Sequence, residues 1–188
     1  MSNAFSYLSV LISIVLGLGM AHLLGGVARA ISRRATTAFY WPTLAWAFFL
    51  LVFIIQVWWV DFALSRLTQW TVAGFASVLL IPATLYFMAF LILPESSDMR
   101  ATFFENRVWF FALLIAVQVF GSLQQLLAEG ALHRDLENWV KVVGVILCGA
   151  AIYFRSETAQ KRFAVVGLIF AVWYVVYFFR LPAVISSP

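Results

Sequence analysis

The ionisable and amide side chains inside long apolar segments are the residues of this sequence best suited to chemistry. His22 lies in such a segment, and an imidazole with a pKa near ~6.5 can relay protons. A titratable group inside a membrane helix is for that reason a functional candidate. The alternative is a neutral histidine that is hydrogen-bonded across a helical bundle. Both interpretations need a facing helix, and Gly19 and Gly26 on the same helix face leave space for one.

A second group of polar residues falls near one common end of the apolar segments. Asp61 and Arg180 are expected at similar depth, where an ion pair would remove two isolated charges. The amides of Gln56 and Gln118 must find hydrogen-bond partners in a low-dielectric region. These groups could line a hydrated pathway, or they could act as interhelical hydrogen bonds and interfacial charges. The pathway hypothesis includes His22, Gln56, Asp61, Gln118, Gln124 and Arg180.

The composition shows what kind of element must hold these side chains. Hydrophobic residues make up 64% of the 188 residues and charged residues 11%, against roughly 45–50% and about 25% in soluble domains. A bilayer can solvate so much apolar surface, whereas a soluble fold of this size cannot. The net charge of +4 comes from basic residues in short loops, without a basic stripe of the kind that binds nucleic acid. We expect membrane lipids and no nucleic acid as partners.

Six apolar segments are each long enough to cross ~30 Å of hydrocarbon, which takes about 20 helical residues. Backbone polar groups in lipid must be satisfied within the segment, so helices are expected. The fifth segment is the shortest. The sequence therefore predicts an all-α, polytopic integral membrane helical bundle that forms one domain over residues 1–188 and has no soluble domain. The expected helices are about 5–28, 39–60, 70–93, 108–127, 139–154 and 163–183.

The basic residues predict an orientation. Eight of the 12 Lys and Arg residues follow the first, third and fifth segments, and such loops face the cytoplasm by the positive-inside rule. Both termini are then expected in the periplasm. Trp58, Trp59 and Trp139 fall at predicted outer ends, where indole rings favour the headgroup level.

Two of the segments share a pattern at an offset of 62 residues. Phe48-Phe49-x-Leu51 precedes Gln56, and Phe110-Phe111-x-Leu113 precedes Gln118. One interpretation is three tandem two-helix hairpins, because tandem repeats occur among transporters. The other is coincidence, because phenylalanine and leucine are abundant and six evenly spaced helices share an offset.

Small residues recur at every fourth position of the first segment. Such a stripe lets another helix backbone approach closely. The partner is expected to be another helix of this chain, with the first helix of a second copy as the alternative. The stripe consists of Ser9, Ser13, Gly17, Ala21 and Gly25. In the third segment, Pro82 removes a backbone hydrogen bond and is predicted to be a kink and a candidate hinge.

Motifs for metals and cofactors are absent from the sequence. There is one cysteine, Cys148, and the two histidines, His22 and His133, fall on opposite predicted sides of the bilayer. A zinc or bis-histidine haem site within one chain is therefore not expected. We predict no metal, no catalytic constellation and no cofactor, and allow for a bound lipid.

Two stretches carry a resemblance. They are Tyr7-Leu8-Ser9-Val10-Leu11-Ile12-Ser13-Ile14-Val15-Leu16-Gly17-Leu18-Gly19 and Tyr40-Trp41-Pro42-Thr43-Leu44-Ala45-Trp46. The first two segments resemble uncharacterised small polytopic bacterial inner-membrane proteins. This resemblance implies a bacterial inner membrane and supplies no activity, substrate or functional residue.

Three functions fit these patterns, in this order. The first is a channel or transporter-like subunit for ions, protons or small solutes, assembled as a homo-oligomer. The second is a scaffold or accessory subunit that acts through helix contacts with a membrane partner. The third is an intramembrane enzyme that binds a lipid or quinone, for which the acid–base candidates are His22, Asp61, Glu137 and Lys141.

Overall fold

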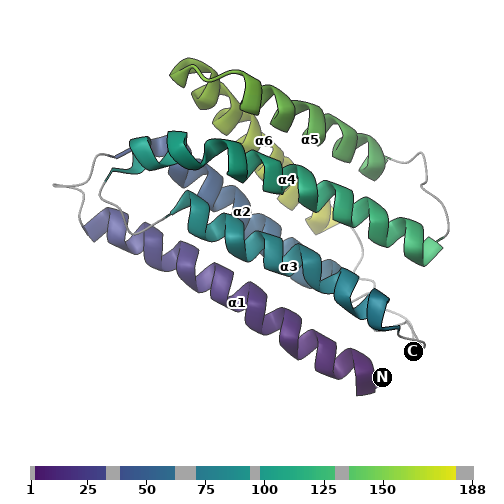
Figure 1. The fold of residues 1–188 in the computed structure, drawn as a ribbon. Coiled ribbons are helices and arrows are strands. Elements are labelled where there is room, and N and C mark those ends of the chain that lie inside the picture. Colours follow the sequence, from purple (N-terminus) through teal and green to yellow (C-terminus); the bar gives the residue numbers. More distant parts are fainter. Residues whose placement is uncertain (1–2, 33–38, 62–70, 94–97, 130–135, 181–188) are drawn as a thin grey trace.

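A computed structural model describes residues 3–32, 39–61, 71–93, 98–129 and 136–180. The side chains of several helix-end residues, among them Asp61, Glu137 and Arg180, lie outside this description. The described residues form six helices, as the sequence predicts, and Figure 1 shows their order. The helices are α1 (Asn3–Ser32), α2 (Trp41–Asp61), α3 (Val72–Ile92), α4 (Met99–Glu129), α5 (Leu136–Tyr153) and α6 (Glu157–Arg180).

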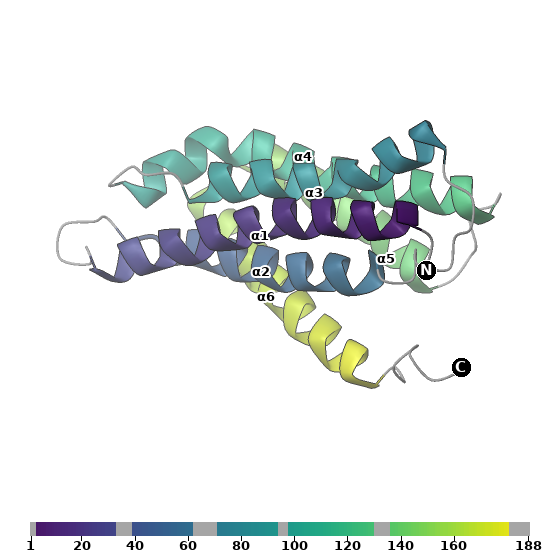
Figure 2. The same ribbon diagram turned by 90° about the horizontal axis from the view of Figure 1, so that it is seen from below.

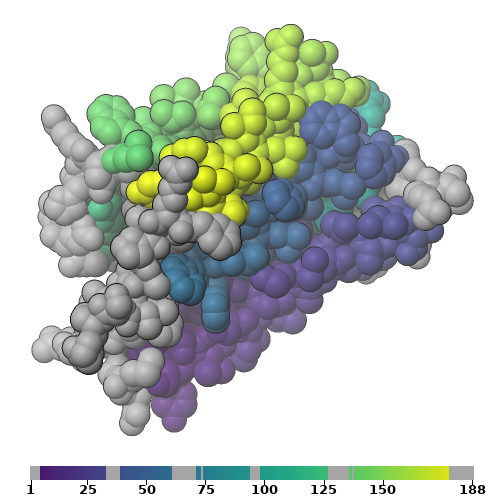
Figure 3. Space-filling view, turned by 180° about the vertical axis from the view of Figure 1, so that it is seen from behind, coloured from purple at the N-terminus to yellow at the C-terminus, as the bar shows by residue number. Residues whose placement is uncertain are grey.

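The six helices form two layers. Helices α1, α3, α4 and α5 lie side by side in that order, and α2 and α6 lie behind them (Figure 1). Helix α2 packs against α1, α3 and α6. The C-terminal part of α6 extends away from the front layer (Figure 2). From behind, α6 lies against α2 (Figure 3). Thus α2 connects the front layer to α6.

Helices α4 and α6 begin earlier than the hydropathy pattern predicts. The backbone N–H of Ala101 donates to the side chain of Asp98 at 2.9 Å, which caps α4 at its start. The N–H of Ala159 donates to the hydroxyl of Ser156 at 3.3 Å, which caps α6. The predicted starts at 108 and 163 were therefore wrong by several residues. Hydropathy marks the apolar part of a helix, whereas these first turns are polar.

The outer surface of the bundle is apolar. Five of the described helices are long and apolar enough to cross a membrane, and α5 is a shorter apolar helix. In the most apolar windows of these five helices, only 22% to 39% of the residues are buried. Large side chains such as Ile146 and Ile169 are more than 60% exposed. Water would oppose so large an apolar surface, whereas lipid accepts it. The chain is therefore a multi-pass integral membrane protein.

Trp46 of α2 joins the two layers. Its indole packs edge-on against Phe110 and Phe111 of α4. On the other side, Gly167 of α6 lies so close that an added Cβ would be 2.9 Å from the indole ring. A side chain at position 167 would overlap the ring, so glycine sets how closely α6 approaches α2.

The three consecutive helix pairs of the chain pack to different extents. Helices α3 and α4 pack closely, whereas α5 and α6 make few contacts with each other. The matched residues also differ in surroundings, since Gln56 bonds to α6 and Gln118 packs against α5. The tandem-hairpin hypothesis stays a prediction from the sequence pattern, and the arrangement of the helices gives it no support.

We expect Gly167→Ala to lower the free energy of unfolding by about 1–3 kcal/mol, because the new methyl group would overlap the indole of Trp46. Gly149→Ala is the matched control, since nothing lies within 4 Å of a Cβ built at that helical position. The control should be neutral or stabilising by up to about 1 kcal/mol. Unfolding in mixed detergent measures both variants. Equal stabilities for the two variants would refute the close α2–α6 contact.

Candidate functional site

His22 joins α1 to the end of α3. Its Nε2 lies 2.9 Å from the carbonyl oxygen of Leu93, so this nitrogen carries the hydrogen and donates it. The ring stacks on Phe90 with 3.8 Å between centroids. Gly26 lies against Leu93, where an added Cβ would be 2.9 Å from the leucine side chain. The facing helix that the glycines predict is α3, and the imidazole satisfies a carbonyl at its C-terminus.

The three glutamines of the predicted pathway each face a neighbouring helix. The Gln56 amide of α2 donates to the Tyr174 hydroxyl of α6. The Gln124 amide of α4 donates to the Ser77 carbonyl of α3 at 2.9 Å. Gln118 of α4 packs on α5, where a Cβ built on Gly144 would lie 2.8 Å from its amide nitrogen.

These contacts distribute the candidate residues over four helix pairs. His22 links α1 to α3, and Gln56 links α2 to α6. Gln124 links α4 to α3, and Gln118 contacts α5 from α4. Asp61 and Arg180 end α2 and α6, and their side chains lie outside the described residues. Within the described part of the chain, the predicted residues form separate interhelical contacts and no single cluster.

The central residues of the small-residue stripe on α1 face away from the bundle. A Cβ built on Gly17 meets nothing within 4 Å, and Ala21 is exposed. At one end, the hydroxyl of Ser13 accepts a hydrogen bond from the indole of Trp58 at 3.2 Å. The buried face of α1 is a different one, and it contains Leu8, Ile12, Leu16, Gly19, Leu23 and Gly26. The expected packing of the stripe inside the chain is therefore wrong for its central residues. A strict spacing of four residues drifts around the helix, because one turn takes 3.6 residues.

Pro82 lies buried inside α3, and the helix continues across it from Val72 to Ile92. Close by, the hydroxyl of Thr84 donates to the carbonyl oxygen of Leu80 at 2.7 Å. The hinge at Pro82 stays a prediction.

A polar contact that the sequence analysis missed joins three helices. The guanidinium of Arg107 is buried at the end of α5 and donates to the carbonyl oxygens of Ala151 at 2.7 Å and Phe154 at 3.2 Å. The amide of Gln160 on α6 is buried too and donates to the same oxygens at 2.9 and 2.6 Å. These carbonyls end a helix and lack helical partners, and a cation is favoured there by the helix dipole. We call Arg107 and Gln160 the α5 clamp.

A sequence signal for the α5 clamp exists. Phe103, Arg107, Phe110 and Leu114 recur at spacings of four, three and four, which places the arginine on the buried face of one helix. The apolar segment was predicted to begin at Val108, so Arg107 was assigned to a loop. Starting the helix at its Asp98 cap would have placed the arginine among the core residues.

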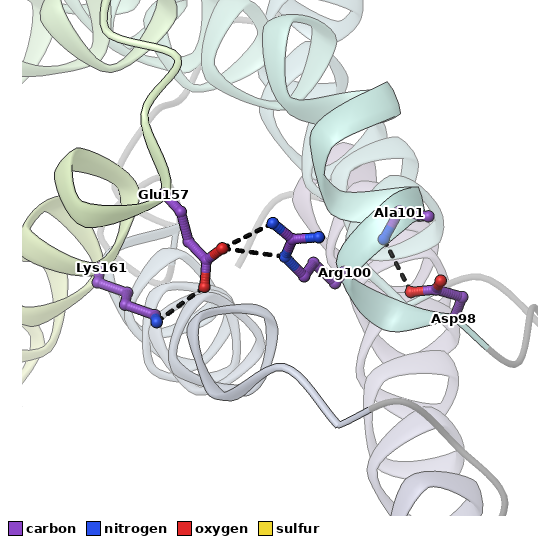
Figure 4. A network of polar contacts seen from close by, with 5 residues as sticks. All are labelled: Asp98, Arg100, Ala101, Glu157 and Lys161. Carbon is purple, nitrogen blue, oxygen red and sulfur yellow. Dashed lines mark hydrogen bonds and ion pairs between the residues drawn. The ribbon is translucent and has the colours of Figure 1, made fainter.

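An ion network joins the first turns of α4 and α6 (Figure 4). One Glu157 oxygen accepts from Arg100 at 2.7 and 3.1 Å, and the other lies 2.8 Å from the Lys161 ammonium. Such partly exposed pairs contribute little stability. Nearby, burial raises the pKa of the Tyr40 hydroxyl, the charge of Glu157 raises it further, and Arg100 lowers it. The pair between Arg100 and Glu157 thus links the first turn of α4 to the first turn of α6.

A small crevice lies between α2 and α6, beside Gln56 of the predicted pathway. Its volume is about 10 Å³, and its lining includes Phe49, Phe53, Gln56, Phe170 and Tyr174. This volume is close to the minimum that one water molecule needs. A quinone or lipid headgroup is far larger, so this crevice is not a site for either. Among the described residues, no three His, Cys, Asp or Glu side chains are grouped to hold a metal ion.

Comparisons with protein-family models, curated proteins and solved structures found no match to this chain.

Replacing His22 separates a structural role from proton transfer. His22→Phe keeps a ring against Phe90 and leaves the Leu93 carbonyl without its donor, so we expect a loss of about 1–3 kcal/mol in the free energy of unfolding. His22→Gln restores a donor and should recover part of the loss. Unfolding in detergent measures both. Wild-type stability for His22→Phe would exclude the structural role.

Proposed function

We propose that this protein is a membrane-embedded scaffold or accessory subunit whose α1 docks a transmembrane helix of another membrane protein. The observation that carries this proposal is the outward position of the small residues at the centre of α1. Gly17 has open space beside it, and Ala21 is exposed. The scaffold function thereby ranks above the channel or transporter function that the sequence placed first.

Lipid alone gives no reason for small residues on an outer face. Glycine inside a helix costs about 0.5–1 kcal/mol relative to alanine, and lipid chains do not need the space that it leaves. A second helix does, because small residues allow backbones to approach closely and gain van der Waals contact. The glycine at position 17 is therefore best explained by a helix that covers it.

The shape of the exposed face also favours helix docking. Val10, Ile14 and Leu18 are exposed large residues at a spacing of four, and they form a ridge. This ridge runs beside the small residues Gly17 and Ala21, which form a shallow groove. Ridges that fit into grooves set the geometry of packed helices. The face therefore offers both elements of a helix–helix interface.

The hydrogen bonds of the polar residues inside the bundle also favour a scaffold. His22, Gln56 and Gln124 each hold a neighbouring helix through a hydrogen bond. A rigid bundle of this kind suits a protein that presents a fixed surface to a partner. The channel hypothesis would need these side chains to release their partners and to face water.

A photo-crosslinking residue at Ala21 should give one discrete protein adduct in the native membrane. The same residue at Ile146 of α5, which is 64% exposed, should give lipid adducts only. We expect Gly17→Leu to remove the Ala21 adduct by filling the groove, and Gly149→Leu on α5 to leave it unchanged. Denaturing gels and mass spectrometry identify the adduct. An adduct with the mass of two copies would assign this face to self-association and contradict the proposed partner. The absence of any protein adduct would refute the proposal itself.

Purified protein in liposomes should leave proton and potassium permeability at the level of protein-free liposomes. The reason is that His22, Gln56 and Gln124 of the predicted pathway each bond to a neighbouring helix. A pH-sensitive dye and a potassium ionophore measure the two fluxes. Flux that rises with protein content would favour the channel function over the scaffold function.

A further inference from the structure

The end of the bundle near the α5–α6 turn carries two arginines that have no acidic partner among the described residues. The carboxylate of Glu157 is shared by Arg100 and Lys161. Arg155 and Arg162 are exposed, and within the described part of the chain no acidic side chain pairs with either of them. This end therefore presents two guanidinium groups that are available to an anion from outside.

The α5 clamp adds a third positive charge that has no acidic partner among the described residues. Arg107 is buried, and its contacts are with carbonyl oxygens, which carry no full charge. Arg155 directly follows Phe154, whose carbonyl oxygen accepts from Arg107, so the two positive charges lie near each other. An anion bound at Arg155 would reduce this repulsion between like charges.

Exposed aromatic side chains place this surface at the depth of lipid headgroups. Trp109 is 68% exposed and Tyr153 is 79% exposed, and rings of this kind favour the boundary between hydrocarbon and water. Tyr153 ends α5, two residues before Arg155. The Arg155 guanidinium is therefore expected at the level of the phosphates.

Arg162 stands at the polar end of the lipid-facing side of α6. Val166, Ile169 and Trp173 follow it at helical spacing, and all three are exposed. An arginine at the end of an apolar face extends its guanidinium to the headgroup region, while its stem stays in contact with hydrocarbon. The same face can hold an acyl chain along its apolar residues.

We propose that Arg155 and Arg162, which are seven residues apart in the sequence and both exposed, bind headgroup phosphates of anionic phospholipids. The acyl chains of these lipids lie along the exposed sides of α5 and α6. Guanidinium groups suit this ligand, because they can donate two parallel hydrogen bonds to phosphate oxygens. A lipid whose only charge is the phosphate is favoured over a zwitterionic lipid, whose ammonium group the surrounding cations repel.

Native mass spectrometry of the full chain in detergent tests the site. The protein is offered equal amounts of phosphatidylglycerol and phosphatidylcholine with identical acyl chains. We expect preferential retention of phosphatidylglycerol. Arg155→Gln and Arg162→Gln should each reduce this preference about fivefold, because one basic residue near a membrane surface contributes that much to binding. Arg155→Lys should have an intermediate effect, because it keeps the charge and loses the paired hydrogen bonds.

Arg100→Gln is the matched control. It removes one positive charge at the same end of the bundle, but its guanidinium is bound to Glu157, so the preference should stay within about twofold of wild type. Equal binding of the two lipids by wild type would overturn the proposal. An equal loss in Arg100→Gln would overturn it too, because the effect would be one of general charge. Displacement of phosphatidylglycerol by excess inorganic phosphate would show that the site binds a free anion, and it would overturn the proposal of a lipid ligand.

Discussion

The absence of water from hydrocarbon is the constraint on which this structure depends. A buried polar group in lipid must find its partner within the protein. At His22 and at Gln56 the described structure meets this demand with hydrogen bonds between helices that are distant in sequence. His22 and Leu93 are 71 residues apart, and Gln56 and Tyr174 are 118 apart. Each such bond adds a directional contact to the apolar packing, which by itself specifies orientation weakly in a bilayer.

The α5 clamp applies the same constraint to a helix end. The last carbonyls of a helix have no backbone donors, and solvent is the usual substitute. At the end of α5, Arg107 and Gln160 take the place of solvent and fix the ends of α4 and α6 in doing so. The buried positive charge of Arg107 thus lies at the end of the bundle where α6 begins. The α5 clamp therefore ties α4 and α6 to the same end of α5.

The sequence predicts the number of helices and the membrane class, because both follow from how many apolar residues stand in each segment. It also indicates that His22 and its glycine neighbours face another helix, since their spacing places them on one side of α1. It does not predict that α3 is that helix, because periodicity identifies a buried face without identifying what covers it. The polar first turns of α4 and α6 were missed for a related reason, since caps lie outside the apolar pattern. Arg107 was lost with the first turns of α4, although its spacing from Phe103 and Phe110 carried the signal.

The two outward-facing features lie at opposite sides of the molecule, and this arrangement has a consequence. Helices α1 and α5 are the outer members of the front layer (Figure 1), so a helix docked on α1 does not cover the arginines beside α5. Lipid at Arg155 and a partner at Gly17 could then be bound together. Any coupling between them must follow a route through α3 and α4 or one through α2 and α6. These helices are held to their neighbours by His22, Gln124, Gln56 and the α5 clamp. Coupling requires an element with two arrangements that both ligands bias. Every contact described along these routes ties one helix to the next, so the two surfaces are expected to act independently, each on its own side of one bundle.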